Sequence, residues 1–351
     1  MPLRESIGRR IAVATVLTTT SLVLTLAVLE LVLRVITPAP PPLSHPPPAP
    51  VGLPELRSVM ELARANTRGV MPGGVPYRTN SSGFRGPDYA RPKPAGTFRI
   101  AVIGDSVAMG SGVPEEETYA ARIEHALNNP PGPITYEVLN VSLAGLNATN
   151  VVEHFVAAGL SYEPDLILYG YTLNDIEGPG YRRSQDPDNH LMGNLTREDW
   201  ERNRIYLTTF FRTRFYSLRE LLWPPYGSYV WELDDNYLDN PGALAAVDKA
   251  FDRLHRIAAD RGACIVLMQH TSLWFLRGFH PFRRHHAVVA HLAAAHGFTN
   301  KDTVDYFMGR DALSLWVNPF DPHPNSEGHA ILSRAALDAL HALPSTCWQH
   351  R

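Results

Sequence analysis

The sequence has very few cysteines, only two among 351 residues. Two cysteines are too few for a small disulfide-rich domain, or for a zinc or iron–sulfur site with four cysteine ligands. Cys264 lies in an apolar, strand-like run and Cys347 lies near the C-terminus, so we expect two free thiols rather than a disulfide. No histidine, including the pair His285 and His286, has a spacing typical of a metal site. The sequence therefore predicts neither a metal nor an organic cofactor.

The chain also lacks a strong charge of either sign. It has 32 Lys and Arg against 35 Asp and Glu, a formal net charge of -3. Such a balance provides no basic surface for nucleic acid, and we expect no nucleic-acid partner. Hydrophobic residues make up 44% of the chain, too many for a disordered protein, so the sequence predicts a folded body.

One long uncharged run near the N-terminus, from Ile11 to Leu29, is the length of a membrane-spanning helix. Arg4, Arg9 and Arg10 precede it, and the positive-inside rule then keeps the N-terminus in the cytoplasm. We expect residues 1–10 to be cytoplasmic and 11–36 to be an uncleaved, single-pass anchor in the cell membrane. The rest of the chain would lie on the periplasmic or extracellular side. One alternative is a cleaved signal peptide. Another is a buried core helix, but such a helix should have a polar stripe and this run has none.

The remaining sequence divides into three parts, the last of which carries an insertion. Residues 37–54 form a linker, because eight of the 30 prolines lie between Pro38 and Pro50 and favour an extended spacer. A lead-in covers 55–96, and a globular domain covers 97–345. Within that domain, 176–241 is an insertion that carries 12 of the chain's 33 aromatic residues. A small packed subdomain is its simplest interpretation; an aromatic shelf for sugar rings, or a lid whose Arg204–Trp223 stretch touches lipid, is the alternative.

Short apolar runs alternate with helical stretches through the globular domain. Strands are expected at 98–104, 135–142, 165–171, 263–269 and, less clearly, 303–307. Helices are expected near 117–128, 149–158, 244–261, 283–295 and 327–340. Buried strands separated by helices predict a parallel sheet covered on both faces, with every loop that follows a strand at one edge.

Polar residues follow the first expected strand as Gly104-Asp105-Ser106. A serine at a sharp turn from strand to helix can act as a nucleophile, although Asp and Ser are also ordinary helix caps. The motif is not the G-x-S-x-G elbow of α/β-hydrolases, because Ala108 stands where the second glycine should be.

Hydrogen-bond donors follow the next two strands, at Gly145 and Asn174. Together with the N–H of Ser106, the Gly145 N–H and the Asn174 amide could form an oxyanion hole for acyl transfer. Taken singly, Gly145 also suits a turn and Asn174 a helix cap.

Near the C-terminus, Asp321-Pro-His323-Pro places an acid two residues before an imidazole in a loop that two prolines stiffen. His323 suits a general base that Asp321 orients, whereas a solvated turn is the alternative. His329, on the following helix, is better explained as a packing residue.

These blocks, in this order, resemble the SGNH (GDSL-like) hydrolase superfamily over residues 97–342. The stretch from Asn80 to Gly86 (NSSGFRG) also resembles the entry of membrane-anchored bacterial members. The resemblance implies a flavodoxin-like α/β/α sandwich with a central parallel sheet. It also implies Ser106 as nucleophile, His323 as base, and an oxyanion hole of Ser106, Gly145 and Asn174.

Two positions depart from the superfamily pattern. Thr172 replaces the glycine of the usual Gly-x-Asn-Asp block, and Asp321 lies two rather than three residues before His323. The Asp-x-His spacing resembles the polysaccharide O-acetyltransferase branch, so hydrolysis and transfer both stay open.

The sequence thus predicts an exported, membrane-tethered serine esterase that acts on short acyl esters, such as O-acetyl groups of envelope carbohydrate. A polysaccharide O-acyltransferase with the same Ser/His site is the first alternative. A non-catalytic carbohydrate-binding envelope protein is the second.

Overall fold

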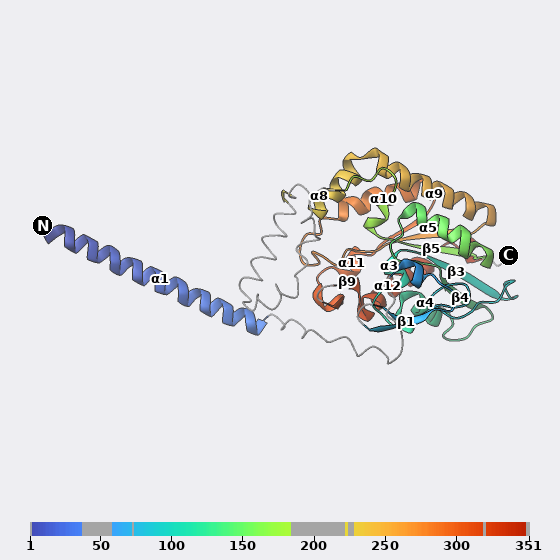
Figure 1. Cartoon of the computed structure of the whole chain (residues 1–351), viewed down its shortest axis with the longest axis horizontal. Coiled ribbons are helices and arrows are strands. Elements are labelled where there is room, and N and C mark those ends of the chain that lie inside the picture. Colours follow the sequence, from blue (N-terminus) through green and yellow to red (C-terminus); the bar gives the residue numbers. More distant parts are fainter. Residues whose placement is uncertain are drawn as a thin grey trace. The chain divides into compact units, whose positions relative to one another are not determined.

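The computed structural model describes residues 2–36, 58–71, 74–183, 222–223, 228–318 and 321–348 (Figure 1). These residues fall into an N-terminal helix and a globular body. The body holds all the strands and every candidate site residue. Each part is described by itself below.

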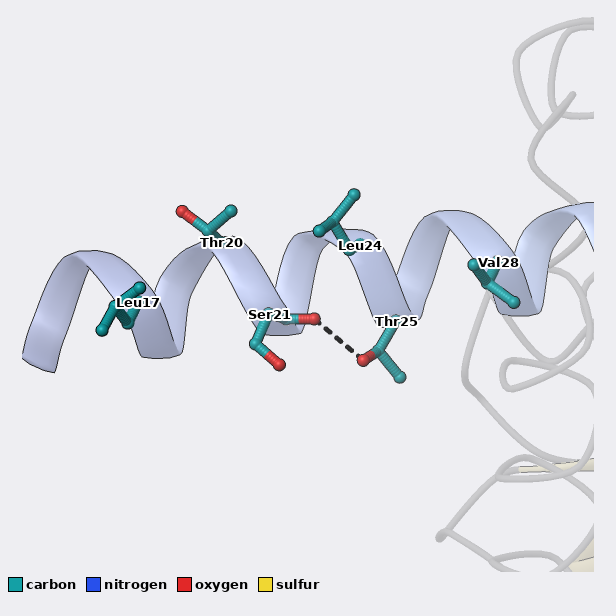
Figure 2. Close-up of a pocket in the computed structure, with 6 residues that line it drawn as sticks. All are labelled: Leu17, Thr20, Ser21, Leu24, Thr25 and Val28. Atoms are coloured by element: carbon teal, nitrogen blue, oxygen red, sulfur yellow. Dashed lines mark hydrogen bonds between the residues drawn. The ribbon is translucent and has the colours of Figure 1, made fainter.

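The N-terminal helix α1 spans Pro2–Ile36, and its segment Gly8–Leu33 is long and apolar enough to cross a membrane. Leu17, Leu24 and Val28 are exposed along it. The hydroxyl of Thr25 donates to the carbonyl of Ser21 at 2.8 Å, so this polar side chain has a partner within the helix (Figure 2). An apolar N-terminal helix of this kind can be a membrane span or a signal sequence.

The centre of the body is a parallel sheet of five strands in the order β4-β3-β5-β6-β7. The bounds are β3 Thr97–Gly104, β4 Thr135–Asn140, β5 Leu166–Tyr171, β6 Cys264–Gln269 and β7 Thr299–Asp302. Counted from the first strand of the sheet, this is the flavodoxin-like order 2-1-3-4-5, with its switch point between β3 and β5. The predicted fold class, a three-layer α/β/α sandwich, is confirmed.

Alternate residues of each strand enter two separate apolar cores. Ile100 and Val102 of β3 pack on one face of the sheet, and Ala101 and Ile103 pack on the other. The first face is covered by α4 (Tyr119–Leu127) and α12 (Ser326–His341); the second is covered by α5 (Ala148–His154), α9 (Pro241–Arg261) and α10 (Arg283–Ala295). Burial on both faces explains why the strand sequences are almost continuously apolar.

The expected strand at 303–307 is wrong. The fifth strand is β7, and Val304–Phe307 is the short helix α11. Val304 and Phe307 are both buried at helical spacing, and the Asp302 carboxylate accepts the Val304 N–H at 2.9 Å, which starts the turn. The strand itself is polar because it lies at the edge of the sheet, so periodicity did not reveal it.

Short elements surround this core. Those of the lead-in are α2 (Val59–Leu62) and the hairpin of β1 (Arg68–Met71) with β2 (Val75–Arg78). Those near the strand ends are α3 (Ser106–Met109), α8 (Tyr229–Asp234), β8 (Trp316–Asn318) and β9 (Asp321–Pro324).

The aromatic-rich insertion is described at its two ends, 176–183 and 228–241, and at residues 222–223. There, Tyr237 is buried and donates its hydroxyl hydrogen to the Leu173 carbonyl at 2.9 Å. The Asn236 side chain accepts the Arg182 N–H at 2.8 Å and donates to the Arg182 carbonyl at 2.8 Å. Both ends therefore pack as part of the body. The expected aromatic shelf, or lid whose Arg204–Trp223 stretch touches lipid, falls mostly on residues outside those described and stays a prediction.

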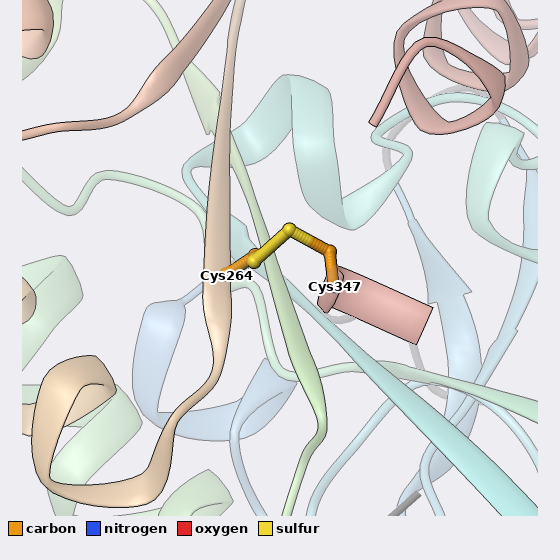
Figure 3. The surroundings of a disulfide bond; sticks show 2 residues. All are labelled: Cys264 and Cys347. Carbon is orange, nitrogen blue, oxygen red and sulfur yellow. A yellow bond between two sulfur atoms is a disulfide. The ribbon is translucent and has the colours of Figure 1, made fainter. Parts of the chain in front are cut away.

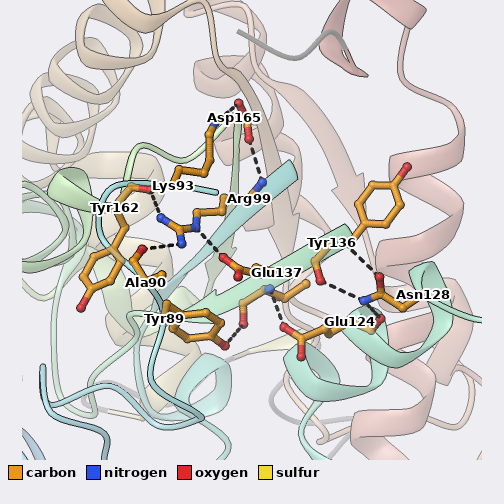
Figure 4. A network of polar contacts seen from close by, with 11 residues as sticks. Tyr89, Ala90, Lys93, Arg99, Glu124, Asn128, Tyr136, Glu137, Tyr162 and Asp165 are labelled. Carbon is orange, nitrogen blue, oxygen red and sulfur yellow. Dashed lines mark hydrogen bonds and ion pairs between the residues drawn. The ribbon is translucent and has the colours of Figure 1, made fainter. Parts of the chain in front are cut away.

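A polar network stabilises the end of the sheet where β3 begins (Figure 4). Arg99 is fully buried, and its guanidinium donates to the carbonyls of Tyr162 at 2.9 Å and Ala90 at 2.7 Å. It also pairs with Glu137 of β4 at 2.5 Å. Because its donors are used, this buried charge is compatible with the surrounding core.

The expectation of two free thiols is wrong, because Cys264 and Cys347 form a disulfide (Figure 3). After α12 the chain turns back through Ser345–Trp348 and places the two Cα atoms 5.5 Å apart. Trp348 packs beside Phe98, with ring centroids 5.2 Å apart, and holds this segment against the sheet. Because Cys264 and Cys347 are 83 residues apart, no local sequence pattern indicates that they pair.

We predict that Cys347→Ser lowers the free energy of unfolding by about 2–5 kcal/mol, because the crosslink no longer restricts the unfolded chain. The free energy of unfolding of the parent and of Cys347→Ser is measured by denaturation of the full chains in detergent, without reductant. Two alkylatable thiols in the unreduced, denatured parent would contradict it.

Candidate active site

The turn after β3 places Ser106 at the carboxyl edge of the sheet. Gly104 has φ +151°, and a Cβ there would lie 2.4 Å from the Gly170 carbonyl oxygen of β5, so only glycine fits. The Asp105 carboxylate accepts the Val107 N–H at 3.0 Å and caps α3. Ser106 is the first residue of that helix and is half-buried.

Asp321 and His323 lie on β9, not in the loop that the sequence predicted. The strand pairs antiparallel with β8, and its alternate residues point to the same side. The His323 Nδ1 therefore lies 2.5 Å from the Asp321 Oδ1. The same carboxylate oxygen accepts the His323 backbone N–H at 3.1 Å. A strand thus explains how a two-residue spacing brings acid and imidazole together.

The other ring nitrogen of His323 faces the candidate nucleophile. Its Nε2 lies 2.9 Å from the Ser106 Oγ, across 217 positions of sequence. If Nδ1–H donates to Asp321, Nε2 is the acceptor for the Ser106 hydroxyl hydrogen. Ser106, His323 and Asp321 thus form one continuous chain of hydrogen bonds, which is the arrangement of a serine nucleophile with an oriented base.

The charges of this chain favour a basic imidazole. Burial alone would lower the pKa of His323, but the hydrogen bond and charge of Asp321, with the charge of Asp105, raise it above the usual 6.5. Burial likewise opposes ionisation of Asp321, yet the hydrogen bond and charge of His323 lower the pKa of this carboxyl below 3.8. Both directions show that the carboxylate stabilises a protonated imidazole.

Asp105 also organises the residues that follow β5. Its two oxygens accept the Thr172 hydroxyl at 2.9 Å and the Asn174 amide at 3.2 Å. Thr172 replaces the glycine of the superfamily pattern. Its hydroxyl donates to Asp105, which in turn accepts the Asn174 amide. An amide nitrogen has two hydrogens, of which the bond to Asp105 uses one; the role of Asn174 as an oxyanion donor stays a prediction.

Gly145 lies in the loop that follows β4, next to β3 in the sheet. The Leu143 N–H donates to the Gly104 carbonyl at 3.1 Å and holds the start of this loop against the turn that carries Ser106. Gly145 itself is exposed, with φ +76°. Gly145 thus follows a strand whose carboxyl end lies at the same sheet edge as Ser106, and its role as an oxyanion donor stays a prediction.

Asp175, the neighbour of Asn174, is buried and accepts the Tyr169 hydroxyl at 2.9 Å. Burial, followed by the charge of Asp105, raises its pKa well above 3.8. Burial beside Asp105 thus disfavours the charged form of Asp175.

Three histidines outside this site have partners within the body. His329 is fully buried, its Nδ1 accepts the Tyr119 N–H at 3.2 Å, and its ring stacks on Tyr119, which confirms the packing role expected for it. His285 pairs with Asp234 and His286 with Asp302. Among the described residues, no group of three His, Cys, Asp or Glu side chains could hold a metal ion.

The sequence did not single out Thr172 as a partner of Asp105, nor Asp105 as more than a cap. Both roles depend on the close approach of β3 and β5. The one available signal was the departure of Thr172 from the superfamily glycine.

No protein-family model and no curated protein matches the chain. Several solved structures do. An acetyl xylan esterase, AlAXEase, is 12% identical over 69% of this chain and 100% of its own, with a TM-score of 0.44. A catalytic mutant of Axe2, an acetylxylan esterase from Geobacillus stearothermophilus, is 17% identical over 72% and 97%, with a TM-score of 0.43. A two-domain esterase active on acetylated mannans is 12% identical over 72% of this chain and half of its own length, with a TM-score of 0.42.

The strand order of the sheet agrees with the fold that the sequence blocks imply. The solved structures, at these identities and TM-scores, carry no argument about what the site does.

We predict that His323 titrates above 6.5 and that Asp321→Asn moves its pKa below that value, because burial then outweighs the remaining attraction of Asp105. Histidine-selective NMR titration of the full chain in detergent measures both values. Ser106→Ala, which keeps the Asp321 charge, is the control and should stay above 6.5. A parent His323 that titrates below 6.5 would contradict the proposed pairing.

Proposed function

We propose that this protein is a serine acyl-hydrolase whose nucleophile is Ser106. The observation that carries the proposal is the unbroken contact from the Ser106 hydroxyl through His323 to Asp321, at 2.9 and 2.5 Å. These distances lie within the hydrogen-bond reach that activation of a nucleophile requires.

In the first half of the reaction, His323 Nε2 removes the Ser106 proton as Oγ attacks the ester carbonyl. The carbonyl electron pair moves to oxygen and a tetrahedral intermediate forms. His323 then gives its proton to the leaving alcohol oxygen, the ester C–O bond breaks, and an acyl-enzyme results.

In the second half, His323 removes a proton from water as the water oxygen attacks the acyl carbonyl. A second tetrahedral intermediate collapses, the proton returns to Ser106 Oγ, and the free acid leaves. Throughout, the charge of Asp321 stabilises the imidazolium and keeps its Nδ1–H in place.

The negative oxygen of each intermediate needs donors that are in place beforehand. The proposed set is the backbone N–H groups of Ser106 and Gly145 with the free amide hydrogen of Asn174. Asp105 supports this role, because its bonds to Val107 N–H and to Asn174 connect the helix of the nucleophile with the amide.

We further propose that the enzyme is exported and tethered to the cell membrane by residues 11–36, with its body outside the cytoplasm. The apolar helix α1 supports the tether, and the Cys264–Cys347 disulfide is typical of an oxidising compartment. An enzyme so placed reaches envelope molecules, and short acyl esters such as O-acetyl groups of envelope carbohydrate are the proposed substrates.

Acyl transfer is the second candidate function. The Asp-x-His spacing favours it, since this spacing resembles the polysaccharide O-acetyltransferase branch. Transfer would use the same acyl-enzyme, and a glycan hydroxyl would replace water as the attacking group.

We predict that Ser106→Ala lowers kcat for p-nitrophenyl acetate by at least about 10³-fold, because no acyl-enzyme can form. The full chain in detergent is assayed, and acetyl, butanoyl and decanoyl esters are compared. Ser111→Ala, five residues along the same turn, is the matched control and should keep full activity.

A Ser106→Ala variant as active as the parent would rule out the mechanism. Slow acetyl release that rises severalfold with an added oligosaccharide, together with acetylated oligosaccharide as product, would favour transfer over hydrolysis.

A further inference from the structure

The lead-in motif from Asn80 to Gly86 folds as a tight turn. The Asn80 side-chain oxygen accepts the N–H groups of Ser82 and Phe84, each at 2.9 Å, and its amide donates to the Pro87 carbonyl at 2.8 Å. Gly83 has φ +83°, and a Cβ there would lie 2.4 Å from the Ala63 carbonyl oxygen. The turn thus has one conformation, in which Phe84 and Arg85 are both buried.

Arg85 directs its guanidinium at the end of the nucleophile helix. Nη1 donates to the carbonyls of Met109, at 3.2 Å, and Gly110, and Nη2 donates to the carbonyl of Val113. Helices leave such carbonyls unpaired at their C-terminus, where a cation is favourable. Gly110 has φ +86°, and a Cβ there would come within 2.9 Å of Nη1, so glycine makes room for the arginine.

This arginine is an unusual buried charge. It is 3% exposed, and among the described residues it has no carboxylate within hydrogen-bond distance. Burial lowers the pKa of Arg85 to about 10, which still leaves it protonated near pH 7. Its bonds to three carbonyls offset part of the cost of burying this charge, while its Nε is buried without a hydrogen-bond partner.

The helix that Arg85 holds is too short to fix its own position. α3 is a single turn of four residues, and one helical turn is not stable alone. Its bonds to the rest of the body therefore decide where Ser106 lies. Asp105 holds the first end through Val107 N–H, Asn140 donates to the Ala108 carbonyl at 3.1 Å, and Arg85 holds the last end.

The lead-in also packs against two of the three segments that contribute to the proposed oxyanion hole, the helix of Ser106 and the Gly145 loop. Met109 of α3 and Leu143 of the Gly145 loop lie in one apolar cluster with three lead-in residues, Leu62, Met71 and Tyr77. Tyr77 donates its hydroxyl hydrogen to the Leu62 carbonyl at 2.8 Å, and Arg85 lies over its ring at 5.5 Å. One wall of packed residues thus supports the nucleophile helix and the Gly145 loop together.

We propose that Arg85 is a positioning residue for the reaction at Ser106. By bonding the carbonyls of Met109, Gly110 and Val113, it fixes α3 so that the Ser106 hydroxyl and N–H keep their geometry. The lead-in is accordingly part of the catalytic unit rather than a continuation of the linker. The claim that Arg85 affects the reaction at Ser106 rests on the proposed function. The claim that Arg85 fixes the position of α3 does not.

A second buried arginine provides a matched control. Arg99 is also buried and also bonds backbone carbonyls, but it lies five residues before Gly104, at the opposite end of β3 (Figure 4). At about 3.3 Å per strand residue this places it roughly 16 Å from the turn that carries Ser106. If lost stability alone lowered the rate, substitution of either arginine should lower kcat. If lost positioning of α3 lowers it, only substitution of Arg85 should.

The experiment compares Arg85→Met and Arg99→Met with the parent, as full chains in detergent. Rates for p-nitrophenyl acetate are measured on the folded fraction, and amide hydrogen exchange is measured by mass spectrometry. We expect Arg85→Met to lower kcat about 10- to 100-fold with KM within about twofold, since misplacement near 1 Å costs this much. Arg99→Met should keep kcat within about twofold of the parent, even if its thermal stability falls as much as that of Arg85→Met.

Hydrogen exchange gives a readout that needs no activity. In Arg85→Met, amides of 106–113 and 141–147 should exchange faster, whereas in Arg99→Met the faster exchange should be near 97–100 and 162–166. If either methionine variant fails to fold, the pair Arg85→Lys and Arg99→Lys replaces it; lysine cannot span three carbonyls, so the same contrast is expected.

Equal kcat in the Arg85 and Arg99 variants, with no faster exchange at 106–113, would overturn the inference. A parent without Ser106-dependent hydrolysis would overturn the proposed function instead. In that case the exchange pattern still decides whether Arg85 holds α3.

Discussion

A buried carboxylate, that of Asp105, connects two of the chain segments on which the candidate site depends, the helix of Ser106 and the chain after β5. It is 1% exposed and accepts bonds from Val107, Thr172 and Asn174. The first bond starts the helix of Ser106, and the others fix the chain after β5. The strands make these contacts possible, because the glycine pair of β3 and β5 lets the two backbones approach closely. Together with Asp321, Asp105 also raises the pKa of His323.

Much of this arrangement follows from sequence patterns whose physical cause is local. Strands buried on both faces read as apolar runs, so four of the five were found with ends correct to within about two residues. The polar edge strand β7 was missed, because an edge strand needs no apolar face and the neighbouring Val304 and Phe307 belong to a helix. The Asp321–His323 spacing was explained through a loop, whereas the period of two in a strand explains it better.

Tertiary contacts account for what the sequence could not show. The disulfide joins residues 83 positions apart after the chain reverses beyond α12. The bond from Thr172 to Asp105 spans two strands, and the contact of Arg85 with α3 crosses from the lead-in into the domain. The lead-in was separated from the domain because its sequence lacks the alternation of strands and helices. Its packing against Met109 and Leu143 makes the two one folded unit.

The proposed mechanism requires a covalent intermediate at Ser106, and intact-protein mass spectrometry tests for it directly. The full chain is mixed with excess p-nitrophenyl acetate, quenched in acid within the burst phase, and then digested to locate any adduct. The mechanism predicts one added acetyl group on Ser106 in the parent and none in Ser106→Ala. An acetyl group on another residue, or active turnover with no adduct at any quench time, would contradict it.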